Sequence, residues 1–175
     1  MNAILYFIVV SPKNFHTTTI LIYKGIKQLQ NDLLISNSTS DCNYPQIVWN
    51  GTDFFLIWVD RADGSRFHYA QIDETGNVIT QDSVLSGIDH AIRYPSLVWT
   101  GTEYGLCWIQ NGVPNRALCF TRFLNPINAS NERECLFESD QVLIKTSLVW
   151  RGTHFGIAWN ADHDGSWGIR FTQFE

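Results

Sequence analysis

The sequence predicts an all-β fold built from repeated antiparallel sheets, and three observations lead to this prediction. One Trp-rich motif occurs at Trp49–Asp60, Trp99–Gln110 and Trp150–Ala161, so that it recurs after 50 and then 51 residues. Self-similarity at such a spacing is typical of repeat architectures. Apolar residues alternate along each copy with the period of a strand rather than that of a helix. Turn-forming pairs such as Asn-Gly separate the apolar segments.

Each copy of the motif predicts a two-residue β-hairpin. The turn pairs are Asn50-Gly51, Thr100-Gly101 and Arg151-Gly152, and Asn-Gly favours a type I′ turn. The second strand of each hairpin places large residues on one face, and in two copies the other face is small. The large sets are Phe54, Leu56, Trp58; Tyr104, Leu106, Trp108; and Phe155, Ile157, Trp159, and the small ones are Gly105, Cys107 and Gly156, Ala158. This pattern suits sheets stacked face to face, and we expect Trp58, Trp108 and Trp159 to be buried between sheets.

The strands fall into units at about residues 2–44, 45–94, 95–145 and 146–175, which together form one domain. In chain order we expect strands at Ala3–Val10, Thr18–Tyr23, Leu33–Ser36, Gln46–Trp49, Asp53–Asp60, Arg66–Asp73, Val78–Leu85, Leu97–Trp99, Glu103–Gln110, Ala117–Leu124, Glu134–Glu138, Ser147–Trp150, His154–Trp159 and Gly168–Phe174. The first unit lacks its opening strand and the last lacks its closing one. Four-stranded sheets repeated radially define a β-propeller. The predicted fold class is therefore a partial β-propeller of about three and a half four-stranded antiparallel blades.

The N-terminal apolar segment Ala3–Val10 admits two interpretations. Its length resembles the apolar part of a secretion signal, but no basic residue precedes it and no small-residue cleavage pattern follows. The segment also falls in the register of the repeat, with Ile4, Tyr6 and Ile8 at the positions of Phe54, Leu56 and Trp58. We interpret it as a strand. No apolar run approaches the roughly 20 residues of a membrane-spanning helix.

Composition excludes some classes of function and leaves the cysteines open. The chain is 45% hydrophobic and 17% charged with a net charge of −5, so it lacks the basic surface that nucleic-acid binding needs. Four cysteines, Cys42, Cys107, Cys119 and Cys135, do not make a dense disulfide framework. Cys107 and Cys119 lie on consecutive predicted strands and can face each other. We favour two small buried thiols, and the oxidation state of all four stays open.

The repeat resembles a known group of propeller repeats. The shared pattern is Y-P-x-[LI]-V-W-x-G-T-x-[FY]-x-[LI]-x-W, which begins at Tyr44 and Tyr94 and is followed by Asp-Gly turns. It looks like the Trp-rich propeller repeats of uncharacterised, mostly bacterial and often secreted proteins, and covers residues 2–175. That resemblance implies a propeller fold and favours an extracellular or cell-surface location.

A more distant similarity links the chain to the Asp-box propellers of sialidases. Asp63-Gly64-Ser65 and Asp164-Gly165-Ser166-Trp167 resemble the Asp box. They lack the spacer between Asp and Gly, and they lie between the second and third strands of a unit, where the family's box follows the third. Sialidase activity is therefore not transferred to this chain.

The candidate ligand-binding residues are Trp167, Asp164, Asp63 and Arg93. An indole offers a flat apolar face to a sugar ring, and Trp167 lies outside the repeat register, on a loop with Asp164. The six repeat tryptophans recur at fixed register, which favours a core role for them over stacking on sugars. Four arginines, Arg93, Arg116, Arg151 and Arg170, can form an anion-binding cluster if the fold gathers them at one end.

No metal, cofactor or catalytic residue is predicted. Carboxylates of Asp60 with Asp63, and of Asp162 with Asp164, are suitable Ca²⁺ ligands, but turn formation is the better explanation, because the second repeat has no carboxylate at these positions. The five histidines show no metal-ligand spacing, and no nucleophile elbow is present. Glycosylation sequons begin at Asn37, Asn50 and Asn128, and their use depends on a secretory route.

We therefore expect a non-catalytic binding or interaction module with a glycan or protein ligand. The alternatives are a fragment of a sialidase-like or glycosidase-like hydrolase, which needs two converging carboxylates, and a truncated repeat block without independent activity. Two apolar strand edges, near Ala3–Val10 and at Gly168–Phe174, predict self-association or further blades from a longer chain.

Overall fold

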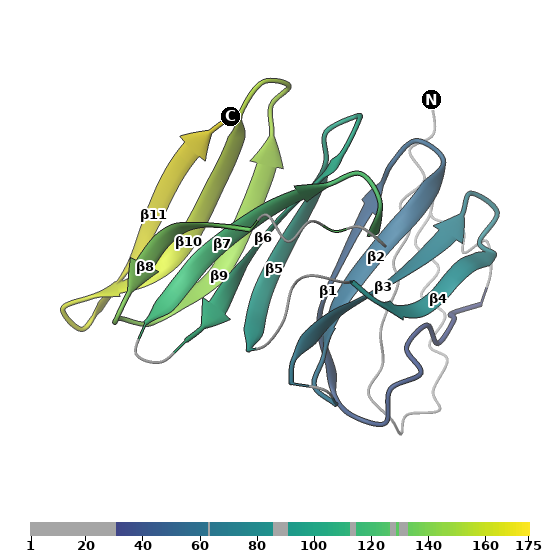
Figure 1. Cartoon of the computed structure of the whole chain (residues 1–175), viewed down its shortest axis with the longest axis horizontal. Coiled ribbons are helices and arrows are strands. Elements are labelled where there is room, and N and C mark those ends of the chain that lie inside the picture. Colours follow the sequence, from purple (N-terminus) through teal and green to yellow (C-terminus); the bar gives the residue numbers. More distant parts are fainter. Residues whose placement is uncertain (1–30, 63, 86–90, 113–114, 127–128, 130–132) are drawn as a thin grey trace, which may run out of the picture.

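Three antiparallel sheets stand side by side in the computed structural model, which describes residues 31–62, 64–85, 91–112, 115–126, 129 and 133–175 (Figure 1). The first sheet contains β1 (Cys42–Trp49), β2 (Asp53–Asp60), β3 (Arg66–Asp73) and β4 (Val78–Val84). The second contains β5 (Ile92–Trp99), β6 (Tyr104–Asn111), β7 (Arg116–Phe123) and β8 (Glu134–Ser139). The third contains β9 (Leu143–Trp150), β10 (Phe155–His163) and β11 (Ser166–Phe174), with β11 at its edge.

The all-β prediction is confirmed, and each copy of the repeat forms one sheet. The fourth strand expected at Glu134–Glu138 is present as β8, and the third sheet has no fourth strand among the described residues. The strand expected at Leu33–Ser36 is wrong, because these residues belong to none of the described strands. The strands expected at Ala3–Val10 and Thr18–Tyr23 lie outside the described residues. Among the described residues, no helix is long and apolar enough to cross a membrane.

The first strand of each sheet begins earlier than the sequence predicts because it crosses a β-bulge. The bulged residues are Tyr44, Tyr94 and Lys145, and all three have a positive φ, of 58°, 53° and 49°. A bulge accommodates an extra residue without ending the strand. It also accepts proline, which otherwise removes a ladder hydrogen bond, so Pro45 and Pro95 lie inside β1 and β5 rather than before them.

The hairpin at each Gly-Thr pair is present, but the predicted type I′ turn is wrong. Trp49 pairs with Phe54, and the Asn50 N–H donates to the Asp53 carbonyl at 3.1 Å, so Gly51 and Thr52 form the tip. Positive φ falls on Gly51 alone, at 104°, whereas a type I′ turn requires it at both central residues. Glycine at the first central position is the pattern of a type II′ turn. The Asn50 side chain further fixes the tip by accepting hydrogen bonds from the Thr52 and Asp53 amides, each at 2.9 Å.

The core forms where the facing surfaces of neighbouring sheets meet. Between the first and second sheets, Phe55, Ile57 and Tyr69 meet Tyr104 and Trp108. Between the second and third, a matching cluster forms from Cys107, Ile109, Leu118, Phe120, Phe155, Ile157 and Trp159. The small face predicted for the second strand is used as expected, since a Cβ on Gly105 would lie 2.7 Å from the Phe155 ring.

The three tryptophans predicted to be buried are confirmed as core residues. Trp58, Trp108 and Trp159 are 2%, 0% and 6% exposed. Trp108 and Trp159 lie between sheets, whereas Trp58 packs in a cluster with Ile35, on the face of the first sheet turned away from the second. The first tryptophan of the motif differs: Trp49 is 42% exposed, and Trp99 and Trp150 are half-buried. A core role for all six was therefore wrong for Trp49, because a residue at the end of an edge strand has fewer neighbours to cover it.

The sheets approach one another most closely through their first strands. β1 lies beside β5, and β5 beside β9, while the outer strands β4, β8 and β11 belong to the diverging side of the stack (Figure 1). Two polar contacts join the inner strands. The Thr146 hydroxyl donates to the Tyr94 carbonyl at 2.5 Å, and the Leu148 amide donates to the Ser96 hydroxyl at 2.9 Å. The rings of Tyr44 and Tyr94, on successive bulges, lie 5.0 Å apart.

Candidate functional site

A polar and aromatic crevice lies between the first and second sheets, at the end that carries the Gly-Thr hairpins. Its volume is about 270 Å³. It is lined by Asn50, Tyr69, Gln71, Thr80, Trp99, Tyr104, Leu124, Asn125 and Pro126. The lining combines amide and hydroxyl groups with three aromatic rings. Such a mixture offers hydrogen bonds and flat apolar contact to one ligand.

Hydrogen bonds fix the polar side chains of this crevice. The Asn50 amide nitrogen donates to the Tyr104 hydroxyl at 2.7 Å and to the Asp53 carboxylate at 3.0 Å. The Gln71 side-chain oxygen accepts from the Thr80 hydroxyl at 3.3 Å. Burial raises the pKa of Tyr104, and the Asn50 hydrogen bond offsets part of this rise. The Tyr104 hydroxyl therefore stays protonated at neutral pH and presents a neutral polar group to the crevice.

None of the described sequence-predicted binding residues lines this crevice. Asp164 lies at the tip of the β10–β11 hairpin, where both central residues, Asp164 and Gly165, have positive φ and give the type I′ pattern. The loop position expected for Trp167 is wrong, because Trp167 lies within β11 and pairs with Asp162. Trp167 is 55% exposed, as expected for a residue outside the repeat register. Arg93 is exposed on β5 of the neighbouring sheet, where it pairs with Ile109. Asp63 lies outside the described residues.

The fold does not gather the four arginines at one end. Arg93 and Arg116 lie near one end of the second sheet, at the start of β5 and β7. Arg151 follows β9 in a Gly-Thr hairpin at the opposite end, and Arg170 lies within β11 with its guanidinium 5.6 Å from the centre of the Phe137 ring. Arg93 lies at the start of β5 and Arg151 follows the end of β9, and these two strands run side by side in the same direction, so about one strand length separates the two arginines.

The turn interpretation of the loop carboxylates is supported. The Asp60 carboxylate accepts from the Ala62 amide at 2.7 Å, and the Asp162 carboxylate accepts from the Gly165 amide at 3.0 Å. Among the described residues, no group of three or more His, Cys, Asp and Glu side chains lies close enough to hold a metal. The Asp60 and Asp162 carboxylates therefore stabilise the turns that follow them by accepting hydrogen bonds from nearby backbone amides.

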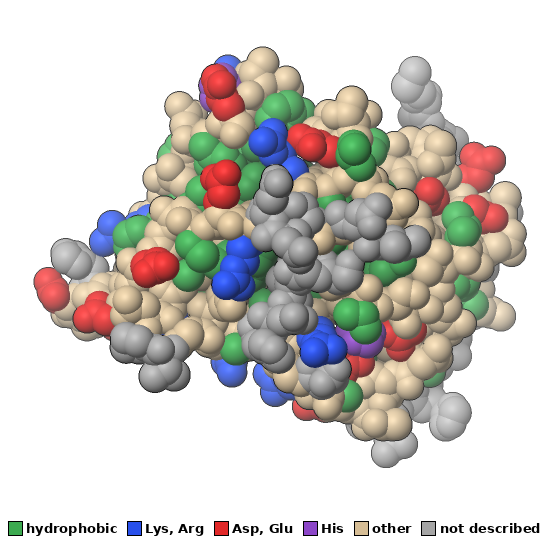
Figure 2. Space-filling view, in the orientation of Figure 1, with side chains coloured by type: hydrophobic (Ala, Val, Ile, Leu, Met, Phe, Trp, Pro, Cys, Tyr) green, Lys and Arg blue, Asp and Glu red, His purple; other side chains and the backbone are tan. Residues whose placement is uncertain are grey.

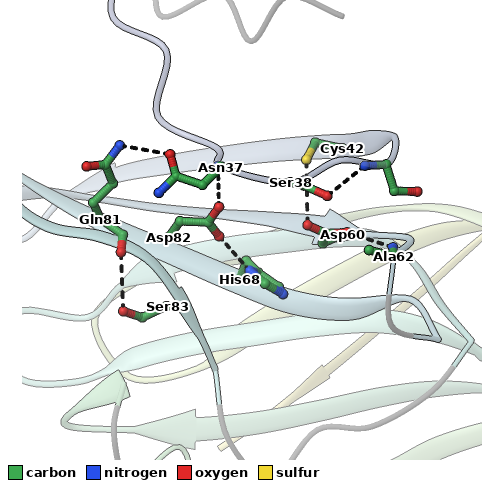
Figure 3. Close-up of polar contacts among 10 residues, drawn as sticks. Asn37, Ser38, Cys42, Asp60, Ala62, His68, Gln81, Asp82 and Ser83 are labelled. Carbon is green, nitrogen blue, oxygen red and sulfur yellow. Dashed lines mark hydrogen bonds and ion pairs between the residues drawn. The ribbon is translucent and has the colours of Figure 1, made fainter.

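A second polar cluster joins the 31–41 segment to the first sheet (Figure 3). The His68 ring nitrogen Nδ1 lies 2.6 Å from Asp82 Oδ1, and both side chains are largely buried. The other oxygen of Asp82 accepts a hydrogen bond from the Asn37 amide. Asp82 has a positive φ of 42°, so the backbone of β4 is bent to direct this carboxylate. The arrangement ties β3, β4 and the preceding segment together.

Cys42 is a poor nucleophile in this cluster. Its thiol lies 3.9 Å from the Asp60 carboxylate, and burial, with a smaller effect of Asp60, raises the pKa of Cys42. A nucleophilic cysteine needs the opposite environment, one that favours the thiolate. The Asp82 carboxylate, which pairs with His68, also accepts a hydrogen bond from the Asn37 amide. The residues of this cluster therefore position the chain rather than activate a nucleophile.

A third feature is an apolar surface on the third sheet, which we call the open face and define by Val149, Ile169 and Phe171 together with Gly156 and Ala158. These residues face away from the second sheet, and the exposed fractions of Val149, Ile169 and Phe171 are 57%, 72% and 65%. Figure 2 shows the molecule from the side, with hydrophobic side chains interspersed among acidic and basic ones. Beside the open face, at the edge of β11, a groove of about 410 Å³ runs between β8 and β11, lined by residues that include Phe137, Trp159 and Arg170.

Comparison with known proteins gives no relative: no family model, no curated protein and no solved structure matches the chain. The function therefore has to be argued from the described residues alone.

Sequence reasoning missed the residues that pair across elements. The Asn50–Tyr104 contact joins two sheets, and the His68–Asp82 pair joins β3 to β4. For the Asn50–Tyr104 contact, the sequence signal is a difference between the repeats: Asn50 has a side-chain amide, whereas its counterparts Thr100 and Arg151 do not. No local pattern marks the His68–Asp82 pair.

Proposed function

We propose that the protein is a non-catalytic interaction module built from blades of the β-propeller type, and that its open face binds a second copy of this chain. The close approach of β1, β5 and β9, with the later strands diverging, supports the blade arrangement. The proposal rests on one observation, the exposure of the open face at positions that are buried elsewhere in the molecule.

The equivalent positions in the first two sheets are covered by the next sheet. Tyr69 and Phe120 are 5% and 4% exposed, whereas Phe171, at the same register position, is 65% exposed. The preceding pair shows the same contrast, with Phe67 and Leu118 fully buried and Ile169 exposed. Large exposed apolar patches are rare on monomers and mark interaction sites. The open face therefore continues a type of interface that the molecule already uses twice.

We expect the open face of one copy to bind the open face of a second copy. The opposite end of the stack is covered over its second and third strands, because Leu56, Trp58 and Ile72 are each about 97% buried or more. Two open faces can instead meet around a two-fold axis, in an isologous contact. Gly156 suits this role: a ring of the neighbouring sheet packs on its counterpart Gly105, and Phe171 of the second copy can occupy the equivalent place.

The test is the mass of the full chain in solution, measured by light scattering and sedimentation over a wide concentration range. We expect a dimer of about twice 20.1 kDa that dissociates on dilution. Phe171→Lys should shift the population to monomer, because it buries an unpaired charge in the contact. Leu124→Lys is the matched control, since Leu124 is also apolar and exposed but lies after β7, away from the open face. A wild-type monomer at all concentrations, or equal sensitivity to both changes, would overturn the proposal.

The crevice between the first and second sheets favours a second candidate function, glycan binding. Sugars present hydroxyl groups at their edges and apolar C–H groups on their faces, which matches Asn50, Gln71 and Thr80 beside Trp99 and Tyr104. Saturation-transfer NMR with galactose, N-acetylglucosamine and sialic acid as probes tests it. Trp99→Ala should abolish a saturation-transfer signal that Trp150→Ala, the equivalent change in the third sheet, leaves intact. A signal unaffected by Trp99→Ala would place binding elsewhere.

A further inference from the structure

Two cysteines lie directly opposite each other on neighbouring strands of the second sheet. Cys119 on β7 pairs with Cys135 on β8, next to a register shift between Leu118 and Cys119. Their sulfur atoms are 3.2 Å apart, and both are free thiols. A disulfide bond has a sulfur–sulfur length of about 2.0 Å, so only a small side-chain movement separates the two states.

The two thiols have different access to solvent. Cys119 is fully buried beside Trp108, whereas Cys135 is exposed. Burial raises the pKa of the Cys119 thiol strongly, the neighbouring Cys135 raises it further, and the Arg133 guanidinium offsets only part of this rise. The Arg133 guanidinium donates to Gln110 Oε1 at 2.7 Å, and the Cys119 sulfur lies 3.9 Å from the same oxygen. A disulfide reagent from solution therefore meets Cys135 first.

We propose that Cys119 and Cys135 form a thiol–disulfide exchange site that reacts with low-molecular-weight disulfides of the glutathione type. The Cys135 thiolate attacks one sulfur of oxidised glutathione, forms a mixed disulfide and releases one glutathione thiolate, which takes up the proton that Cys135 lost. Cys119 then loses its proton and attacks the Cys135 sulfur, which releases the second glutathione. The two cysteine thiols are oxidised to one disulfide, and one molecule of oxidised glutathione is reduced to two thiols.

The other cysteines do not suit this reaction. Cys107 lies on the neighbouring strand β6, but its side chain belongs to the core on the opposite side of the sheet from Cys119. Cys42 lies on the first sheet beside Asp60. The site is therefore specific to one pair, and Cys107 provides a matched internal control.

Oxidation would act on the outer strand of the second sheet. β8 contributes Leu136 and Phe137 to the groove beside β11, and the disulfide would join it covalently to β7. A cross-link that closes the loop between β7 and β8 restricts the unfolded chain and stabilises the folded one. We expect the oxidised chain to melt roughly 5–10 °C above the reduced chain, as the usual stabilisation by such a loop implies for a chain of this size.

The experiment equilibrates the full chain with graded mixtures of oxidised and reduced glutathione under native conditions. Thiol titration should show a fall from four free thiols to two, and peptide mapping should recover a Cys119–Cys135 cross-linked peptide. Cys107→Ala should leave both results unchanged apart from the thiol it removes. Cys119→Ala should stop at a stable glutathione adduct on Cys135, which separates attack from resolution.

Cys135→Ser is the variant least exposed to a folding failure, because its side chain is on the surface. It should lose both the cross-link and the rise in melting temperature. Retention of four thiols in the wild-type chain at the most oxidising mixture would overturn the proposal. So would a cross-link that includes Cys42 or Cys107, or a stable Cys135 adduct in the presence of Cys119.

Discussion

The outward faces of the second and third sheets have matching positions and opposite environments. In the second sheet, Leu118 and Phe120 are buried under the third sheet, with Gly105 beneath the Phe155 ring. In the third sheet, Ile169, Phe171 and Gly156 occupy the same register positions, and both apolar side chains are exposed. Side-chain type alone therefore does not decide which of these residues belong to the core. The difference depends on whether another sheet lies against the face.

The largest loss of stability is expected for a tryptophan that lies buried between two sheets. Trp108→Ala should lower the free energy of unfolding by about 3–5 kcal/mol, since Trp108 is fully buried between the first two sheets. Trp49→Ala should cost far less, because Trp49 is 42% exposed. Denaturant unfolding of both variants checks this, and similar losses would show that exposure does not separate the two tryptophans of the motif.

The comparison is sharpest for the matched pair Phe120 and Phe171. Phe120→Ala should cost about 3–5 kcal/mol, as for other buried aromatic residues. Phe171→Ala should cost less than about 1 kcal/mol at concentrations where the chain is monomeric, because little of its surface is buried. A Phe171→Ala penalty that grows with protein concentration would further support pairing through the open face.

Gly105 and Gly156 test the same contrast between a covered and an uncovered sheet face, because adding a methyl group to each probes the space above it. Gly105→Ala should cost about 1–3 kcal/mol, because its Cβ would lie 2.7 Å from the ring of the buried Phe155. Gly156→Ala should change the stability of the monomer by about 0.5 kcal/mol or less, since the nearest atoms are side-chain atoms of Val149 and Phe171, both of which are exposed. Thermal melts of dilute samples compare the two, and equal losses would contradict the assignment.

The smallest effect concerns the β3–β4 turn, which the third sheet lacks because it has no fourth strand in the described chain. Hydrogen bonds from Thr75 and Asn77 lower the pKa of Asp73 to about 2. A carboxyl with a lowered pKa stabilises the folded state above its unfolded pKa near 4, and this contribution is lost as the pH falls toward 2. Asp73→Asn should therefore destabilise the chain at pH 7 and progressively less below pH 4.

Unfolding curves at pH 7 and at pH 3 measure this difference. Glu74→Gln is the control, because it removes the adjacent exposed carboxylate, which takes no part in these hydrogen bonds. A penalty for Asp73→Asn that is the same at both pH values would rule out an ionic origin.

Much of the fold follows from local patterns in the sequence. The alternation around Trp58, Trp108 and Trp159 predicted the central strands and their buried faces, because side chains on a strand alternate between its two sides. The recurrence of the motif predicted equivalent sheets. The turn type was predicted less well. The starts of the first strands were also wrong, because bulges at Tyr44, Tyr94 and Lys145 let these strands begin several residues before the predicted starts.

The candidate site was decided by tertiary structure. Sequence reasoning chose Trp167, Asp164, Asp63 and Arg93 from their residue types, and none of the described ones lines the crevice between the first two sheets. The crevice, the His68–Asp82 pair and the Cys119–Cys135 pair each join residues on different strands or sheets.

The physical reason lies in the range of the interactions. Periodicity and turn chemistry act between residues a few positions apart, so one copy of the motif is enough to specify its own strands. The β7–β8 pairing that places Cys119 opposite Cys135 depends on a register shift and on a long connection, neither of which has a local signature. Exposure of Phe171 depends on the absence of a covering sheet, which no property of its own strand encodes. The sequence by itself determined which residues alternate, and only the packing of the sheets decided which of them are buried, paired or open to a partner.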